Sequence, residues 1–210
     1  CFSAEASAAM VAEIRAAAKV GDSLGGVAEV LAYGVPVGLG SHVQWDRKLD
    51  GLLAGALMSI PAVKAVEIGD GFAQARLRGS VAHDAIALAD GHEASGGYAR
   101  LGDHAGGVEG GISSGSTIVA RVGMKPLATL NRPVLTTVDV ATGESTVSFK
   151  ERTDVTAVPA MGVVAESMVA LVLASEALRK FGGDSLDELR RNQDGFLAHL
   201  GSGSSGPRPA

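Results

Sequence analysis

Residues 46–78 read DRKLDGLLAGALMSIPAVKAVEIGDGFAQARLR, and two periodicities meet in this stretch. The first part carries apolar residues at the spacing of one helix face, namely Leu49, Leu52, Leu53, Ala56 and Leu57. A helix is therefore predicted from about Asp46. The second part predicts two strands, Val63–Ile68 and Phe72–Arg78, which Gly69-Asp70-Gly71 would join as a hairpin with a bulged turn.

The sequence on both sides of this stretch adds further elements. Helices are predicted over residues 4–20, between a Ser3 cap and a Gly21 stop, over residues 159–181, and from Asp184 or Ser185 to about Leu200. Strands are predicted over residues 27–33 and 117–122, and a second hairpin over residues 134–138 and 145–150. Because helices and strands do not alternate strictly, we expect an α+β layered domain rather than a doubly wound one.

Composition limits the class of protein. The 210 residues include 46% hydrophobic ones and carry a net charge of -5. This length favours one domain, which we place at residues 1–200, and the Gly, Ser and Pro of residues 201–210 predict a disordered tail. The negative charge argues against nucleic acid as a partner. No uninterrupted apolar run reaches the roughly 18 residues of a membrane span.

The single cysteine is Cys1, which excludes an internal disulfide framework and favours a reducing, cytoplasmic location. Because the chain opens with this cysteine rather than methionine, we expect a fragment of a longer protein. The five histidines have no metal-ligand spacing and no cysteine partner, so no metal site is expected.

Two glycine-rich patterns have competing interpretations. Residues 111–115, GISSG, match the nucleophile elbow of serine hydrolases, but glycines precede Ser113 and a predicted strand follows it, whereas an elbow needs a strand before the serine and a helix after it. The longer segment 87–116 is either a structural loop or a ligand cradle. It carries neither a dinucleotide-binding G-x-G-x-x-G nor a P-loop.

Arg152-Thr153-Asp154 is a candidate site for phosphate or flavin. In an extended segment positions i and i+2 point to the same side, so Arg152 and Asp154 would share a face while Thr153 points away. An arginine can anchor a phosphate or flavin edge, and a carboxylate can move a proton. From the residues alone, a weak surface ion pair is the favoured alternative.

Several stretches together resemble chorismate synthases and occur in the order of that family. They are GDSLGG (21–26), PVGLG (36–40), ALMSI (56–60), VEIGDGF (66–72), HAGG (104–107), GGIS (110–113), Lys125-Pro126, Arg152–Asp154 and AVP (157–159). The combination of ALMSIPAVK, EIGDGF, HAGG and GGIS is the most specific part. The resemblance covers about residues 1–200 and implies the C-terminal portion of that family's layered β-α-β sandwich, here incomplete.

The resemblance implies an activity, a cofactor and an assembly. The activity is the anti-1,4-elimination of phosphate from 5-enolpyruvylshikimate 3-phosphate to give chorismate, the last common step of the shikimate pathway. The cofactor is reduced FMN, which some members regenerate with NADPH. The assembly is a homotetramer.

The resemblance also assigns roles to residues by motif. The flavin contacts are Pro61, Ala62, Gly110, Lys125, Pro126, Leu127, Ala128, Thr129 and Arg152. Asp154 matches the carboxylate that takes a proton from the flavin N5, so that the flavin can act as a base on the substrate. Arg152 and Asp154 are therefore expected to form one side of the flavin site, with the loop around Gly110 on the other.

Some positions depart from the family pattern. Pro61 stands where many members carry a side-chain amide, so only backbone contact is expected there. Leu127 and Ala128 replace hydroxyl or smaller residues, and Asp103 replaces a common Asn. The family's two catalytic histidines and its phosphate loop match nothing present, and His83 and His104 do not fall on those positions. We therefore expect the chain alone to be inactive.

Two other hypotheses stay open on the sequence. In the first, the chain is a non-catalytic flavin- or phosphate-binding module, or a subunit that acts only with a partner. This hypothesis holds if the DNA upstream of the Cys1 codon does not encode the missing motifs in the same reading frame. A serine hydrolase acting through Ser113 is a weaker third possibility.

Overall fold

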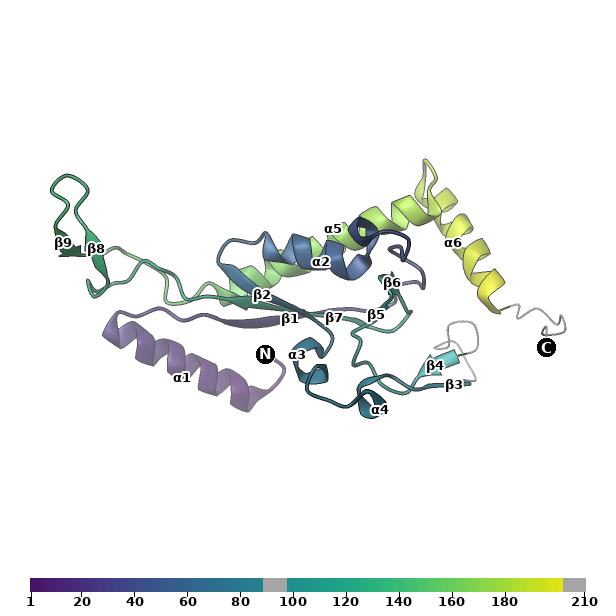
Figure 1. The fold of residues 1–210 in the computed structure, drawn as a ribbon, viewed down its shortest axis with the longest axis horizontal. Helices are drawn as coiled ribbons and strands as arrows, with labels where there is room; N and C mark the ends of the chain where they lie inside the picture. Colours follow the sequence, from purple (N-terminus) through teal and green to yellow (C-terminus); the bar gives the residue numbers. More distant parts are fainter. Residues whose placement is uncertain (89–97, 202–210) are drawn as a thin grey trace.

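The structure is a computed structural model that describes residues 1–88 and 98–201 (Figure 1). Its centre is a three-stranded antiparallel sheet in the order β1 (Gly26–Ala32), β7 (Ile118–Met124) and β2 (Val63–Ile68). The middle strand is the most apolar on its inner face, where Ile118, Ala120 and Val122 are fully buried. Alternate residues of a strand point to opposite faces, so Arg121 lies on the other side.

Two helices cover the inner face of the sheet. They are α2 (Leu49–Met58), which follows the short 3-10 helix η1 (Trp45–Arg47), and α5 (Val158–Phe181). Leu49, Leu53 and Leu57 of α2 have no exposed surface, as the predicted helical spacing of that stretch requires. These residues and the sheet form one core with Met161, Ala165 and Val169 of α5.

The two ends of the chain are helical. The first helix, α1 (Ala4–Val20), has the predicted caps, because Ser3 Oγ accepts the Ala6 N–H at 3.1 Å and Gly21 adopts a left-handed conformation. In Figure 1 it lies on the side of the sheet opposite α5. The last helix, α6 (Leu186–Gly201), packs on the end of α5 through Phe181 and Phe196, whose ring centroids are 5.8 Å apart.

Short elements connect the larger ones. They are α3 (Gly71–Gln74), α4 (Gly79–Ala82), β3 (Ile86–Leu88), β4 (Tyr98–Arg100), β5 (Val108–Glu109), β6 (Ile112–Ser113), β8 (Thr136–Val138) and β9 (Ser145–Val147). The pairs β3–β4, β5–β6 and β8–β9 are each antiparallel. The β8–β9 pair confirms the second predicted hairpin and projects from the body in Figure 1.

The predicted strand Phe72–Arg78 is wrong. Asp70 and Gly71 instead start α3, and the Phe72 N–H donates to Glu67 Oε1 at 2.8 Å. The strand expected to be its partner, β2, pairs with β7, more than fifty residues further along the chain. The pairing of β2 with the distant β7 is therefore favoured over a local hairpin at the Asp-Gly turn, because it buries more apolar surface.

The other predicted elements and the α+β class are confirmed to within a few residues. The predicted tail begins at Gly201, which ends α6, and its remainder, 202–210, lies outside the described residues. Among the residues that the structure describes, one helix, α5, is long and apolar enough by length and composition to cross a membrane. In the structure, its inner face packs on β1 and α2.

Candidate functional site

Most of the predicted flavin contacts lie where α2 and β7 end. Ala62 follows α2, Lys125 follows β7, and the Lys125 N–H donates to the Ala62 carbonyl at 2.9 Å. Two residues further, the Leu127 carbonyl accepts the Ser23 hydroxyl at 2.6 Å. The backbone thus fixes Pro61-Ala62 against the segment that contains Lys125, Pro126, Leu127, Ala128 and Thr129.

The segment with Arg152 and Asp154 lies against this same region. The Thr129 hydroxyl donates to the Thr153 hydroxyl at 2.9 Å, and the Leu24 N–H donates to the Val155 carbonyl at 2.7 Å. Three stretches distant in the sequence, 61–62, 125–129 and 152–154, are therefore brought together.

Arg152 and Asp154 share a face, as their i and i+2 spacing predicts. Arg152 Nη1 lies 3.6 Å from Asp154 Oδ1, while Thr153 turns toward Thr129. The two charged side chains are 85% and 75% exposed, so no other part of the described chain covers them. Such a pair adds little to stability in water. It is available to a ligand or to another polypeptide.

Ala62 has a strained backbone. Its φ is 66°, and it is the one non-glycine residue with positive φ among residues 1–88 and 98–201. The left-handed conformation costs a residue with a Cβ about 1–2 kcal/mol. Strain of this kind is concentrated at ligand sites, where it aims a backbone group. Here it directs the Ala62 carbonyl to Lys125.

Gly110 does not lie with the other predicted contacts. It forms the turn between β5 and β6, and the carbonyl of the next residue, Gly111, accepts the Leu49 N–H at 2.9 Å. Leu49 begins α2, whereas Ala62 lies beyond its other end. A ten-residue helix rises about 15 Å, so this distance separates Gly110 from the other contacts.

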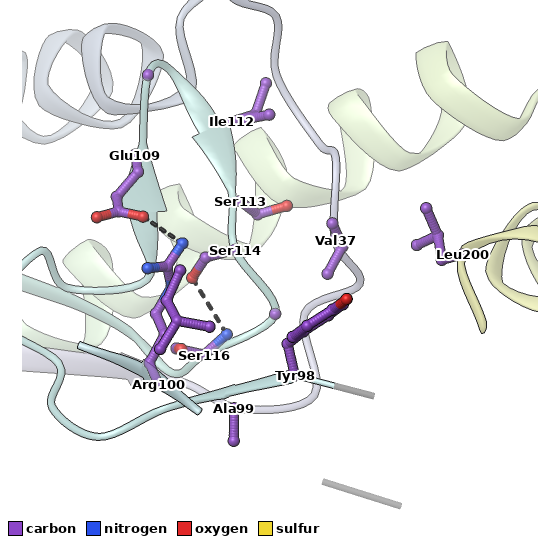
Figure 2. Close-up of a pocket in the computed structure, with 13 residues that line it drawn as sticks. Val37, Tyr98, Ala99, Arg100, Glu109, Ile112, Ser113, Ser114, Ser116 and Leu200 are labelled. Carbon is purple, nitrogen blue, oxygen red and sulfur yellow. Dashed lines mark hydrogen bonds and ion pairs between the residues drawn. The ribbon is translucent and has the colours of Figure 1, made fainter. Parts of the chain in front are cut away.

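A cavity of about 720 Å³ lies beside Gly110 (Figure 2). Its lining comes from loops, short strands and the end of α6, and consists of Val37, Ile86, Tyr98, Ala99, Arg100, Glu109, Gly110, Ile112, Ser113, Ser114, Gly115, Ser116 and Leu200. Arg100 and Glu109 form an ion pair at one wall, and Ser114 Oγ accepts the Ser116 N–H at 3.3 Å. Of the predicted site residues, the cavity contains Gly110 alone.

Ser113 is a structural residue. It is 1% exposed, its hydroxyl accepts the Leu39 N–H at 2.8 Å, and it donates to the Pro36 carbonyl at 2.6 Å. No helix follows it, and no histidine is bonded to it in the described part of the chain. The serine hydrolase hypothesis is therefore wrong, because a nucleophile needs access and a base.

A family model described as chorismate synthase matches residues 1–178. This chain belongs to the chorismate synthase family. It is 60% identical to a chorismate synthase of Salinispora tropica over 200 residues, which cover 95% of this chain and 50% of that protein. A chorismate synthase of Kocuria rhizophila is 59% identical, with 95% and 47% covered.

A solved structure supports the same assignment. It is titled "Crystal Structure of Chorismate Synthase", shares 42% identity, and superimposes with a TM-score of 0.75 over 92% of this chain and 48% of that one. The chain thus spans about half the length of the chorismate synthases it matches. The recognition from motifs is confirmed.

Sequence reasoning about the chorismate synthase motifs missed two polar clusters. In the first, Glu176 Oε2 accepts the Gly40 N–H at 3.1 Å, while Arg179 Nη2 donates to the Gly40 carbonyl at 2.8 Å. Arg179 Nε also donates to Glu176 at 2.8 Å. We call these two side chains the Gly40 clamp. No sequence signal could reveal it, because Glu176 is 136 residues from Gly40.

The second cluster uses Asp70 of the EIGDGF motif and His104 of the HAGG motif. Asp70 Oδ2 lies 2.8 Å from His104 Nδ1, and Asp70 N–H donates to the His104 carbonyl at 2.8 Å. The carboxylate raises the pKa of His104, and the hydrogen bond from His104 lowers the pKa of Asp70, with help from Arg121. The pair therefore holds the start of the 104–107 loop against the end of β2.

The chemistry of the donor groups fits an anionic, planar cofactor of the chorismate synthase kind. Lys125 is exposed and forms no ion pair within residues 1–88 and 98–201, and Arg152 has only its weak pair with Asp154. Two cations beside a strained backbone can therefore bind a phosphate or flavin edge. Within those same residues, no group of three or more His, Cys, Asp or Glu side chains is arranged to hold a metal.

Proposed function

We propose that this chain contributes the C-terminal part of the active site of a chorismate synthase. In this proposal Pro61, Ala62, the segment Lys125–Thr129 and Arg152 contact reduced FMN, and Gly110 contacts it from the other end of α2. The observation that carries the proposal is the convergence of 61–62, 125–129 and 152–154 in a member of this family.

The reaction would be the anti-1,4-elimination of phosphate from 5-enolpyruvylshikimate 3-phosphate to give chorismate. Bound reduced FMN would supply transient electron transfer and a basic nitrogen, with NADPH as the reductant in members that reduce their own flavin. Lys125 and Arg152 would bind and orient anionic groups. Asp154 would accept a proton at a carboxylate oxygen from the flavin N5.

The exposure of Arg152 and Asp154 bears on where the rest of the site comes from. A proton-transfer site works best where water is excluded, and these two side chains lie in water here. We infer that a second surface closes the site. This surface would come from the half of the family's polypeptide that this chain does not match, or from another subunit of a homotetramer. The proposed assembly is cytoplasmic and needs neither a membrane nor nucleic acid.

A chimera tests the function. In it, residues 1–200 of this chain replace the matching half of the Salinispora tropica chorismate synthase. With reduced FMN and 5-enolpyruvylshikimate 3-phosphate, the chimera is expected to form chorismate, and the 210-residue chain alone is not. Asp154→Asn should lower kcat about 100-fold or more, since proton transfer contributes 10²–10⁴-fold.

The matched control is Asp194→Asn, because Asp194 is an exposed aspartate of α6 away from the converging segments. It should leave kcat unchanged. A folded chimera whose kcat responds equally to both substitutions would contradict the role of Asp154. Appreciable chorismate formation by the chain alone would contradict the need for the missing histidines.

Two observations also favour a second candidate, a non-catalytic flavin-binding subunit that needs a partner. Arg152 and Asp154 are exposed, and the chain spans about half the length of its relatives. This candidate predicts that the chimera quenches FMN fluorescence but forms no chorismate. The proposed enzyme predicts that the chimera both quenches FMN fluorescence and forms chorismate.

A further inference from the structure

The loop between α1 and β1, residues 21–26, lies at the end of the sheet where the predicted flavin contacts converge. Gly26 begins β1 and pairs with Met124, the last residue of β7. In Figure 1 the loop leads from α1 into β1 at the end of the sheet where β7 ends and α5 begins. None of its residues belongs to the flavin contacts that the family motifs assign. We call it the 21–26 loop.

Ser23 of the 21–26 loop binds the first of the two segments that carry a cation, 125–129. Its hydroxyl donates to the Leu127 carbonyl at 2.6 Å, and the serine is only 6% exposed. Asp22 fixes the backbone of this serine, because Asp22 Oδ1 accepts the Ser23 N–H at 2.9 Å. The other carboxylate oxygen of Asp22 pairs with Arg132. The loop therefore holds the 125–129 segment at its middle and the chain just beyond its end.

The next residue of the loop binds the second segment. The Leu24 N–H donates to the Val155 carbonyl at 2.7 Å, directly after the 152–154 stretch. Two successive residues of one short loop are thus bonded to the two segments that carry Lys125 and Arg152. A shift of the loop would therefore move both segments.

Gly25 brings the loop backbone directly against the start of the 125–129 segment. A Cβ on this residue would lie 2.3 Å from the Met124 carbonyl oxygen and 2.9 Å from the Pro126 nitrogen, which is closer than real Cβ atoms come to such neighbours. Only a glycine permits this approach. The position of Pro126 is therefore tied to that of the loop.

The bond from Ser23 differs from the direct bond between the two segments. Ser23 is buried, so water cannot readily replace its hydroxyl, and the Leu127 carbonyl would lose this donor. The direct bond joins the Thr129 and Thr153 hydroxyls at an exposed place, where water competes for both groups. The relative position of the two segments therefore depends more on the 21–26 loop than on their own contact.

We propose that Ser23 is a positioning residue of the flavin site, which sets the spacing between the Lys125 and Arg152 segments. This inference rests on the proposed function and adds to it a residue that touches no ligand. A ligand binds best to groups that are already in place, because little ordering remains to be done on binding. Displacements of more than about 0.5 Å weaken such a site.

Titration of FMN fluorescence with the chimera described above tests this role. Ser23→Ala should raise the Kd for FMN about tenfold or more, whereas Ser23→Thr keeps the hydroxyl and should stay within about threefold of the parent. The absorption band of bound FMN should also shift in Ser23→Ala, because the surroundings of the ring change. A loss of stability alone would change neither the Kd nor the band of the folded protein.

The matched control is Gln74→Ala. Gln74 Nε2 also donates to a backbone carbonyl at 2.6 Å, that of Ala82, and Gln74 lies beyond the opposite end of β2 from Ala62. Its removal should leave the Kd unchanged. Equal weakening by Ser23→Ala and Gln74→Ala would overturn the role of Ser23, and so would binding as weak in Ser23→Thr as in Ser23→Ala.

A parallel variant separates this inference from the proposed function. Arg152→Ala removes a proposed flavin contact and should also raise the Kd about tenfold. If Arg152→Ala weakens binding and Ser23→Ala does not, the positioning role is wrong while the flavin site stands. If neither substitution weakens binding, the flavin site itself is wrong, and the role of Ser23 falls with it.

A further measurement needs neither the chimera nor FMN. In the 210-residue chain, Ser23→Ala should accelerate hydrogen exchange at the Leu24 and Lys125 amides about tenfold, because both amides bond to segments that the loop holds. Gln74→Ala should leave these two amides unchanged. Exchange at the parent rate in Ser23→Ala would show that the serine does not hold the segments and would overturn the proposal.

Discussion

Replacing Glu176 with alanine should destabilise the chain by an amount that the Gly40 clamp predicts. Gly40 is buried, and its N–H has Glu176 as its hydrogen-bond acceptor. Leaving a buried N–H unsatisfied costs about 1–3 kcal/mol. Arg179 is partly exposed and loses an ion pair worth at most about 1 kcal/mol. The sum for Glu176→Ala is therefore about 1–4 kcal/mol.

Urea denaturation followed by circular dichroism measures this cost. With a slope of about 2 kcal/mol/M, the midpoint should fall by about 0.5–2 M. Glu176→Gln keeps an acceptor for Gly40 and should cost about 1 kcal/mol. Hydrogen exchange at the Gly40 amide should accelerate in Glu176→Ala, because that N–H opens to water.

The control is Glu166→Ala on the same helix. The Glu166 side chain is exposed and makes no hydrogen bond or ion pair with any described residue, so its removal should change the unfolding free energy by less than about 0.5 kcal/mol. Equal effects of Glu176→Ala and Glu166→Ala would refute the reasoning. The clamp would then add nothing to stability despite its geometry.

Three further predictions concern the proposed site and its neighbour. In urea denaturation, Ala62→Val should lower the unfolding free energy by about 1–2 kcal/mol, because a β-branched residue resists positive φ. Ala62→Gly should change it by less than about 0.5 kcal/mol. Equal effects of the two substitutions would contradict the backbone strain at Ala62. Arg152→Ala and Asp154→Asn should each change stability by less than about 0.5 kcal/mol by the same assay, and a loss above about 1.5 kcal/mol would make the pair structural. The His104–Asp70 pair should stabilise the fold most between about pH 3.8 and 6.5. Because the pKa of His104 is raised on folding, its contribution to stability is fully present below pH 6.5 and is lost as the pH rises through the pKa of the folded state. Because the pKa of Asp70 is lowered on folding, its contribution is fully present above pH 3.8 and is lost as the pH falls through the pKa of the folded state. Thermal unfolding of His104→Gln should therefore differ from the parent more at pH 5 than at pH 8, and an equal difference would contradict it.

The elements that sequence predicted well are those with local determinants. Ser3 and Gly21 bound α1 by direct hydrogen bonds, and the leucines of α2 are buried as their spacing requires. The strand predicted at 72–78 failed because its partner was chosen from neighbours in sequence. Strand pairing depends on all the strands of the sheet, so a local turn motif is not enough to predict the partner of β2.

In the candidate site, too, features with local determinants were predictable from sequence, and features that depend on distant parts of the structure were not. The shared face of Arg152 and Asp154 follows from strand geometry and was predictable. Its exposure was not, because it depends on which surface covers it. The separation of Gly110 from Ala62 was also hidden, since it follows from the direction in which α2 runs between them.

The strand order has a consequence for folding kinetics. β1 and β2 never pair with each other, because β7 lies between them and is the last of the three to emerge during synthesis. About ninety residues separate β1 from its partner, so the nascent chain holds two unsatisfied strands until Met124 has left the ribosome. Folding should then begin only after translation has passed that point, and any pause before it would prolong the period in which both bare edges can aggregate.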